Sequence, residues 1–286
     1  MRITITGFFI VLAALLFFSC EKESSRQEIP SYIRIDSVQL EDNININEGT
    51  LSHNITDAWV YVNNQLIGTF ELPATFPVLA KGEADIMIKA GIKLNGVAST
   101  RIPYPFFTEY RANSVTLTPE TVTTMQPVVQ YNETSSIPWH ESFDDDNLRM
   151  KQQGDTTLAR ITGQEAFDAS GSGRIVLQDS AMFFEATSDT GYVLPRNGNP
   201  VFLEMNFKTN HTLTTGLYAD NPATSQQKAI VVLNKTATWK KIYINLTTTV
   251  LNTQQATSYR VFLGTVRSPE TEKAVIDIDN LKIIHF

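Results

Sequence analysis

The sequence contains a single cysteine, Cys20, and only four histidines in 286 residues. One thiol near the start of the chain excludes a disulfide framework and leaves the rest of the protein without a cysteine nucleophile. The histidines are His53, His140, His211 and His285, and none of their spacings is that of a metal site. We therefore expect stability to come from apolar burial and no cofactor to be required.

Basic clusters and catalytic motifs are also lacking. The formal net charge is −7, and Lys and Arg are nowhere concentrated, which excludes the electrostatic footprint of a nucleic-acid-binding protein. There is no G-x-S-x-G nucleophile elbow, and SGSG at 170–173 is better interpreted as a flexible turn. A pair of glycosidase carboxylates has no fixed spacing. The sequence thus predicts a protein that is not an enzyme, with a glycoside hydrolase as the third-ranked alternative.

The chain begins with one basic residue, Arg2, followed by an uninterrupted apolar run at 7–18 and then Ser19-Cys20. This order is that of a secretory signal peptide. The stretch LLFFSC resembles a bacterial lipobox, and its two phenylalanines before Ser19 are typical of Bacteroidota. The resemblance implies a signal peptide at 1–19, lipidation of Cys20 and a polar tether at 20–28. The alternative is an uncleaved anchor helix at 3–19, which approaches the length needed to span a membrane.

The residues behind Cys20 give a further hint of location. Glu21 and Glu23 partly fit the acidic export signal of Bacteroidota surface lipoproteins, although Lys22 fits less well and a solvated linker is the alternative. We expect a lipid-anchored protein of the outer membrane, with the cell surface slightly favoured over the periplasmic face. The lipid chains would hold it to the membrane, because the acidic surface would be repelled by anionic lipid.

Short apolar segments bounded by Asn, Gly, Pro, Asp and Thr predict an all-β protein of two tandem β-sandwiches. In the first domain, 29–133, alternation predicts a strand at 32–40 with a break near Asp36. Hairpins are predicted at 58–73 and 84–100, with turns at Asn63-Asn64 and Asn95-Gly96. Pro103 and Pro105 place the next segment at an edge or in a loop. The domain resembles an immunoglobulin-like sandwich without its cysteine pair.

The second domain is predicted at 134–286, after a polar stretch near 133–138. Ten short strands at this spacing suit a jelly roll. Their predicted positions are 139–143, 157–162, 174–177, 181–185, 201–208, 214–218, 228–233, 239–246, 258–264 and 274–285.

Four motifs of the second domain are more specific: ESFD at 141–144, WKKIYINL at 239–246, YRVFLG at 259–264 and VIDIDNLKII at 275–284. They resemble the galactose-binding-like and carbohydrate-binding-module jelly rolls. The resemblance covers about half of the chain and implies the fold more firmly than any ligand. The alternation predicts that Trp239, Ile242, Ile244, Val275, Ile276 and Ile278 supply apolar surface to the closing strands.

In the resembled modules the opening and closing strands lie side by side and share a structural calcium ion. The matching positions are Glu141, Asp144 and Asp279, and carboxylate oxygens are the ligands that calcium prefers. The alternative is that Asp144 belongs to an ordinary solvated turn and Asp279 caps its own loop.

Exposed aromatic rings would make a platform for sugar rings. Aromatic residues of a sandwich also commonly fill its core, which is the alternative for each. The candidates are Tyr104, Phe106, Phe107, Tyr110, Tyr192 and Tyr218.

Three tripeptides resemble the Asp-Ser/Thr-x O-glycosylation sequence of exported Bacteroidota proteins. They would place glycans on Ser37, Thr156 and Ser180.

Three functions compete at this point. The first is a non-catalytic binding or scaffolding lipoprotein, for example an accessory subunit of an outer-membrane protein complex. The second is a surface lipoprotein that binds a polysaccharide through its jelly roll, and the third is the glycoside hydrolase.

Overall fold

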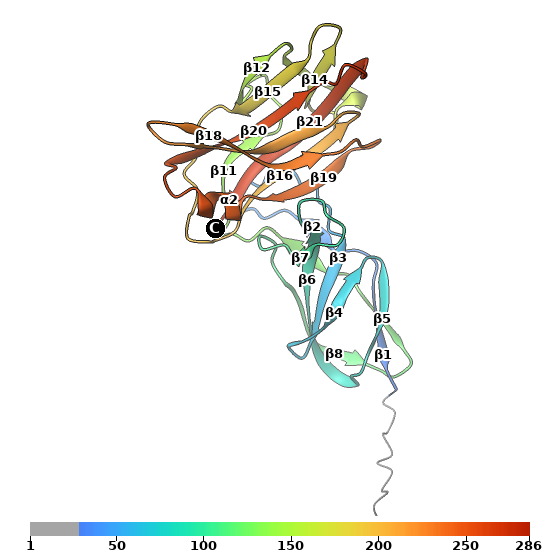
Figure 1. Cartoon of the computed structure of the whole chain (residues 1–286). Helices are drawn as coiled ribbons and strands as arrows, with labels where there is room; N and C mark the ends of the chain where they lie inside the picture. Colours follow the sequence, from blue (N-terminus) through green and yellow to red (C-terminus); the bar gives the residue numbers. More distant parts are fainter. Residues whose placement is uncertain (1–28) are drawn as a thin grey trace, which may run out of the picture.

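The computed structural model describes residues 29–286, which form two β-sandwiches, one beyond the other (Figure 1). Among the described residues, helix is confined to a short 3₁₀ turn, Gly163–Glu165 (η1), and one short α-helix, Thr247–Asn252 (α2). The predicted all-β class is confirmed. Within the described residues no helix combines the length and the apolarity that a membrane crossing requires. Cys20 and the predicted signal peptide and tether lie outside the described residues.

The N-terminal half contains ten strands in a five-stranded sheet, a three-stranded sheet and a two-stranded sheet. The central strand of the largest sheet pairs with strands on both sides. The ten strands are β1 (Ser31–Ile35), β2 (Gln39–Glu41), β3 (Asp57–Val62), β4 (Gln65–Glu71), β5 (Ala74–Val78), β6 (Gly82–Lys93), β7 (Arg101–Pro103), β8 (Tyr110–Leu117), β9 (Val122–Met125) and β10 (Val128–Gln130).

Both predicted turns are present in this half. Asn63 and Asn64 have φ of 51° and 65° between β3 and β4, and Asn95-Gly96 has φ of 53° and 73° after β6. Asparagine and glycine tolerate this left-handed region better than other residues, so the dipeptides reverse the chain at little steric cost. The break predicted near Asp36 separates β1 from β2.

The C-terminal half is a jelly roll of two antiparallel sheets. Sheet D has the order β13-β14-β21-β16-β19, with β11 also on β21, and sheet F has the order β12-β15-β20-β17-β18. The strands are β11 (Ser136–Glu141), β12 (Met150–Gly154), β13 (Leu158–Ile161), β14 (Ser172–Gln178), β15 (Phe183–Ser188), β16 (Val201–Thr209), β17 (Leu213–Asp220), β18 (Ser225–Leu233), β19 (Lys240–Asn245), β20 (Ser258–Val266) and β21 (Lys273–His285).

The last strand, β21, changes which side of its alternating pattern faces the core. Ile276 and Ile278 pack in the jelly-roll core, but after Asn280 it is Leu281 and Ile283 that do so. Asn280 has φ of 50°, and the pairing with β16 shifts register at this point. This irregularity turns Lys282 and Ile284 away from the core, as expected where a bulge inserts an extra residue.

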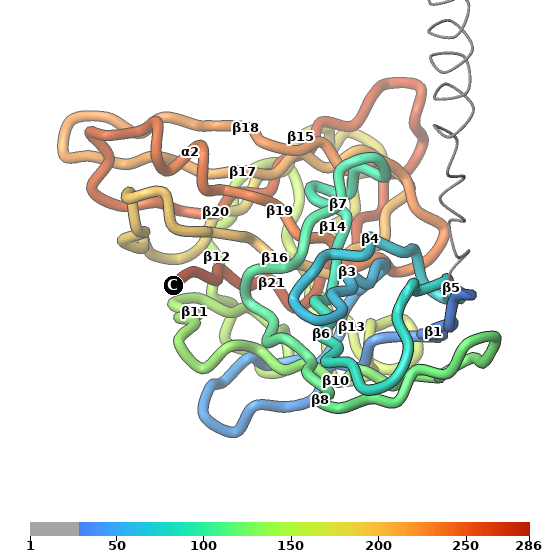
Figure 2. Tube along the Cα trace, turned by 90° about the horizontal axis from the view of Figure 1, so that it is seen from below, coloured from blue at the N-terminus to red at the C-terminus, as the bar shows by residue number. Residues whose placement is uncertain are grey.

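The two halves share a continuous apolar cluster at their junction. Phe106 and Tyr131 from the N-terminal half pack with Phe202, Tyr243 and Ile284 from sheet D. In Figure 2 the N-terminal strands lie across β16 and β21. The outer face of sheet D is therefore a second buried surface, which explains why β16 and β21 are buried on both sides.

The turn after β6 docks on the edge of sheet D. Leu94 forms an isolated bridge with Tyr243, Asn95 donates its backbone N–H to the Tyr243 carbonyl oxygen at 2.9 Å, and Asn95 Oδ1 accepts from Asn245 at 2.8 Å. The left-handed backbone at Asn95-Gly96 thus serves the junction as well as the hairpin.

Candidate functional site

Three aromatics of the proline-broken loop were predicted as a sugar platform, and the structure corrects this. Tyr104, Phe106 and Phe107 are 3%, 0% and 7% exposed, because sheet D covers them. Tyr104 lies edge-on to Phe202 with ring centroids 5.4 Å apart. Rings enclosed in this way cannot present a face to a ligand, and their function is to join the two halves.

A buried ion cluster lies within the same junction, centred on the fully buried Glu204 of β16. Its carboxylate accepts hydrogen bonds from the Tyr104 hydroxyl at 2.6 Å and the Tyr131 hydroxyl at 2.8 Å. Lys241 Nζ lies 2.9 Å and Lys282 Nζ 3.6 Å from its Oε2. The carboxylate thus links donors from both halves of the chain.

The charges of this cluster shift one another's protonation. Burial alone would raise the pKa of Glu204, but Lys241 and Lys282 together with the tyrosine hydrogen bond outweigh it and lower the pKa to about 2. Burial lowers the pKa of Lys282 to about 8. Burial, reinforced by the Glu204 charge, holds the pKa values of Tyr104 and Tyr131 well above 10. At neutral pH the carboxylate is ionised and both phenols are neutral donors.

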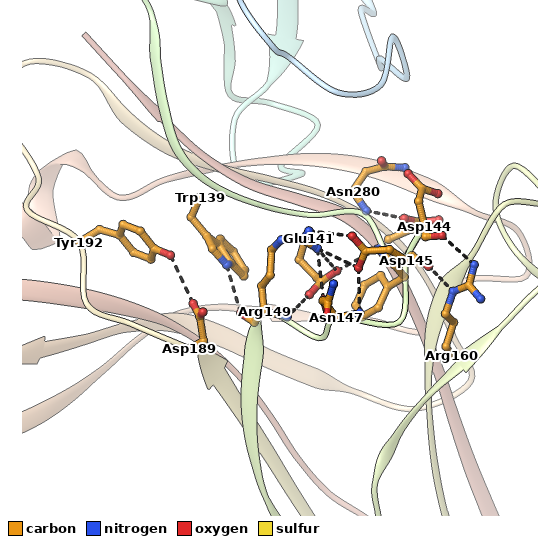
Figure 3. Close-up of polar contacts among 12 residues, drawn as sticks. Trp139, Glu141, Asp144, Asp145, Asn147, Arg149, Arg160, Asp189, Tyr192 and Asn280 are labelled. Atoms are coloured by element: carbon orange, nitrogen blue, oxygen red, sulfur yellow. Dashed lines mark hydrogen bonds and ion pairs between the residues drawn. The ribbon is translucent and has the colours of Figure 1, made fainter.

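Of the predicted calcium ligands, Glu141 and Asp279 lie in β11 and β21, as expected, while Asp144 lies in the exposed loop after β11 (Figure 3). Glu141 is buried and accepts the backbone N–H of Phe143 at 2.9 Å and that of Arg149 at 2.5 Å. It therefore closes the loop between β11 and β12 with both oxygens.

The residues at this place do not fit a calcium ion. The Oδ2 of Asp279 accepts from Ser172 Oγ at 2.6 Å, and burial raises its pKa to about 7. Arg160 donates to the carbonyl oxygens of Phe143, Asp144 and Ser170 at 2.5 to 2.9 Å. The guanidinium thus occupies the carbonyl oxygens that a cation would use. Within residues 29–286 no group of three acidic or histidine side chains is placed to hold a metal ion.

Tyr218, another predicted platform residue, does lie in a groove. It belongs to β17, on the outward face of sheet F, and the groove has a volume of about 300 Å³. Strand register places Glu185 of β15, Arg260 of β20 and Gln153 of β12 on the same face. Glu185, Tyr218 and Arg260 each lie between two core residues of their strands, and Gln153 pairs with Glu185, so the sheet itself aims the four side chains to one face.

Glu185 organises this groove although its residue is only 7% exposed. It accepts hydrogen bonds from Gln153 Nε2 at 2.9 Å, Tyr218 Oη at 3.0 Å and Gln227 Nε2 at 2.7 Å. Arg260 lies 5.0 Å from the centre of the Tyr218 ring. Burial, followed by the hydrogen bond to Glu185, raises the pKa of Tyr218, so its hydroxyl remains a donor at neutral pH.

Positive and negative groups in and beside the groove are equal in number, with Lys151 and Arg260 against Glu185 and Asp220. Arg260 donates to both carboxylate oxygens of Asp220, at 2.7 and 2.9 Å. This arginine hydrogen bond is the main reason that the pKa of Asp220 is lowered. The groove therefore presents planar amide, carboxylate, guanidinium and phenol groups that hold one another in position.

The remaining predicted platform residues, Tyr192 and Tyr110, are less suited to stacking on a sugar ring. Tyr192 is partly buried, its backbone pairs with that of Tyr259, and its hydroxyl donates to Asp189 Oδ1 at 3.3 Å (Figure 3). Tyr110 is partly buried against the N-terminal core.

The predicted glycosylation positions all lie outside strands. Ser37 and Ser180 are exposed and Thr156 is half-buried. Glycosylation at these sites stays a prediction.

Trp239 and Val275 are the two residues that the sequence pattern misplaced, since both are only partly buried and lie outside the jelly-roll core. Trp239 precedes β19, whereas Ile242 and Ile244 within that strand are in the core as predicted. Its ring contacts Phe167 edge-on, with centroids 5.4 Å apart, and Lys208 Nζ lies 5.7 Å from its centre. Trp239 shares the odd-numbered phase of Lys241 and Tyr243, which is the signal that would have placed it outside the core.

Comparisons with known proteins found no matching family model and no matching curated protein. Among solved structures, a variant of a family 29 carbohydrate-binding module complexed with mannohexaose has 13% identity and a TM-score of 0.35, covering 53% of this chain and 90% of its own. Another variant, complexed with cellulohexaose, has 11% identity and a TM-score of 0.34, covering 53% and 90%.

The enzymatically active domain of tailspike protein 4 from bacteriophage CBA120 has 12% identity and a TM-score of 0.37, covering 48% of this chain and 19% of its own. These structures are similar over about half of the chain at most, and identities this low assign no ligand to it.

Proposed function

We propose that this protein is a non-catalytic, lipid-anchored saccharide-binding protein, and that the groove on sheet F binds a neutral, hydroxyl-rich sugar chain. The observation that carries the proposal is the hydrogen-bonded set around Glu185, in which Gln153, Tyr218 and Gln227 converge on one nearly buried carboxylate. A few fixed polar groups in a concave site are what orient a small ligand.

The balance of charge supports a neutral ligand. Arg260 is neutralised by Asp220, and the Tyr218 ring offers a flat surface for the apolar side of a sugar. Side-chain amide groups can both donate hydrogen bonds to hydroxyls and accept them, and a carboxylate can accept them.

Binding of the full chain, purified in mild detergent, to an array of neutral glycans tests the proposal. Tyr218→Ala and Gln227→Ala should each weaken retention about tenfold, which corresponds to about 1.4 kcal/mol. Gln226→Ala is the matched control, because Gln226 pairs with the core-side Ala219 and takes no part in the Glu185 set. Equal retention of all three variants would refute the groove as the site.

A scaffolding function remains the second candidate, favoured by an apolar patch at one end of the same face. Register places Phe183, Val266 and Val232 there, and they are 37%, 64% and 56% exposed. Such a patch suits a protein partner. A detergent pull-down that recovers one membrane protein with the wild type, but not with Val266→Asp, would favour this function.

The lipid anchor is part of the proposal. Cys20→Ala should move the protein from the membrane fraction to the soluble fraction, and intact mass should show acyl chains on the wild type alone, since several acyl chains anchor firmly. Membrane retention of the Cys20→Ala variant would refute it.

A further inference from the structure

A second cavity, separate from the groove on sheet F, lies between the two halves and has a volume of about 550 Å³. The N-terminal half contributes the loop before β3 and the turn after β6, and sheet D contributes β16, β19 and the residues before β19. We call this cavity the junction cleft. A ligand there would touch both halves of the chain.

The loop that forms one wall is held in place from sheet D. The backbone N–H of Asn54 donates to Tyr243 Oη at 3.0 Å, and its side-chain Nδ2 donates to the Lys241 carbonyl oxygen at 3.1 Å. Asn206 Nδ2 donates to Ser52 Oγ at 2.8 Å. The wall is therefore positioned before any ligand arrives, which lowers the entropy lost on binding.

Two buried polar atoms of the cleft lining have no hydrogen-bond partner. Asn206 is 1% exposed and its Oδ1 accepts from no group of residues 29–286. Lys241 is 6% exposed, and although its Nζ is 2.9 Å from Glu204 Oε2, it makes an ion pair without hydrogen-bond geometry. A buried acceptor without a hydrogen bond costs about 1 to 3 kcal/mol, so a ligand hydroxyl that donates to Asn206 Oδ1 would be favoured.

The cleft also has an aromatic wall. Trp239 and Phe167 both line it and support each other edge-on, and Trp239 is only partly buried. A partly exposed, braced indole provides a flat apolar surface beside polar groups.

The junction cleft differs from the groove on sheet F in the charge of its lining. Its lining includes Lys93, Lys240 and Lys241 and no aspartate or glutamate, in a chain whose net charge is −7. Lys93 pairs with Glu71 at 3.4 Å and Lys241 with Glu204, but Lys240 is exposed and has no ion-pair partner within residues 29–286. The ammonium group of Lys240, in the lining of the same cleft as Trp239, attracts an anion.

We propose that the junction cleft binds an acidic saccharide, with a sugar ring against Trp239, a sugar carboxylate at Lys240 and a sugar hydroxyl donating to Asn206. A cavity of this size accommodates a short oligosaccharide. The ligand would also bridge the two halves, because residues of both halves line the cleft.

Calorimetric titration of the full chain in mild detergent with trigalacturonate tests this, with galactotriose as the neutral probe. Trigalacturonate should bind at least about tenfold more tightly than galactotriose, and raising the salt concentration should weaken it, since exposed charges are screened. Trp239→Ala should weaken binding about tenfold, whereas Trp239→Phe, which keeps a ring, should lose less. Lys240→Gln should weaken trigalacturonate alone, about three- to tenfold.

Lys235→Gln is the matched control, because Lys235 is an exposed lysine nearby in the sequence that does not line the cleft. Tyr218→Ala should leave trigalacturonate binding unchanged, so failure of the groove and failure of the cleft are distinguishable. Equal affinity for both probes would overturn the assignment of an acidic ligand. No binding of trigalacturonate, or unchanged binding by both Trp239→Ala and Lys240→Gln, would overturn the site and leave Asn206 with an ordered water instead.

Discussion

Replacing Glu204 with glutamine should expose how strongly the two halves depend on each other. The substitution keeps the shape but removes the negative charge from a site where Lys282 is 0% and Lys241 6% exposed. Removing one partner of a buried ion pair destabilises a protein by about 3 to 5 kcal/mol, because the remaining charge stays unpaired. Here two ammonium groups lose their shared carboxylate, so we expect a loss of about 4 kcal/mol.

The stabilisation by Glu204 depends on pH, because only the ionised carboxylate pairs with the two lysines. Because the pKa of Glu204 is lowered to about 2 in the folded protein, its stabilisation is fully present above pH 4.5 and is lost as the pH falls toward 2. Guanidinium chloride denaturation of the full chain in mild detergent should therefore show a large difference between wild type and Glu204→Gln at pH 7. The difference should shrink steadily below pH 4.5.

Glu133→Gln is the control, because Glu133 is exposed, and it should change stability by less than about 0.5 kcal/mol. Tyr131→Phe should cost less in the Glu204→Gln background than in the wild type, since the hydroxyl would then meet a neutral amide. A loss below about 1 kcal/mol for Glu204→Gln at pH 7 would show that the lysines reach water or shed their protons, and would refute the reasoning.

Three further predictions concern other sites. Because burial raises the pKa of Asp279 to about 7, the stability that its protonated form contributes is present below pH 3.8 and is lost as the pH rises through 7. Between pH 4.5 and 7 the free energy of unfolding of the wild type should therefore fall by about 2 to 3 kcal/mol more than that of Asp279→Asn. An equal fall for both proteins in chemical denaturation would contradict this. Arg160→Gln should lower stability by about 2 kcal/mol, and Arg160→Lys should recover less than half, because one ammonium cannot span three carbonyl oxygens; full recovery in chemical denaturation would show that charge alone suffices. Phe106→Ala should cost about 3 to 5 kcal/mol and separate the unfolding of the two halves in calorimetry, and a single unchanged transition would show that the aromatic junction does not couple them.

The sequence predicted most strands because alternation is a local signal. The ten strands expected in the C-terminal half are present, whereas β12 was missed, since Met150–Gly154 reads MKQQG and four of its five residues are exposed. The proline residues correctly demoted the segment around β7 to a short edge strand. The alternation of apolar and polar residues indicates the period of each segment, and the turn residues indicate where the segments end.

The sites were harder to predict because their members are distant in the sequence. Glu204 meets Tyr104 across 100 residues, and Asn206 meets Ser52 across 154. Loop position suggested that Phe106 and Phe107 were exposed, but a second domain covers them. Tyr218, a candidate exposed ring in the sequence, lies on the outward face of sheet F, while its partners Glu185 and Gln227 gave no signal, because single polar residues in strands are common.

Strand β21 completes two buried surfaces at once. Its thirteen residues pair with β11, β14 and β16, and they face the jelly-roll core on one side and the junction with the N-terminal half on the other. The strand is also far in the sequence from β11 and β14, with which it pairs. Sheet D therefore cannot close until this distant strand has paired, and a chain in which β21 is still unpaired leaves both surfaces of the sheet open to aggregation.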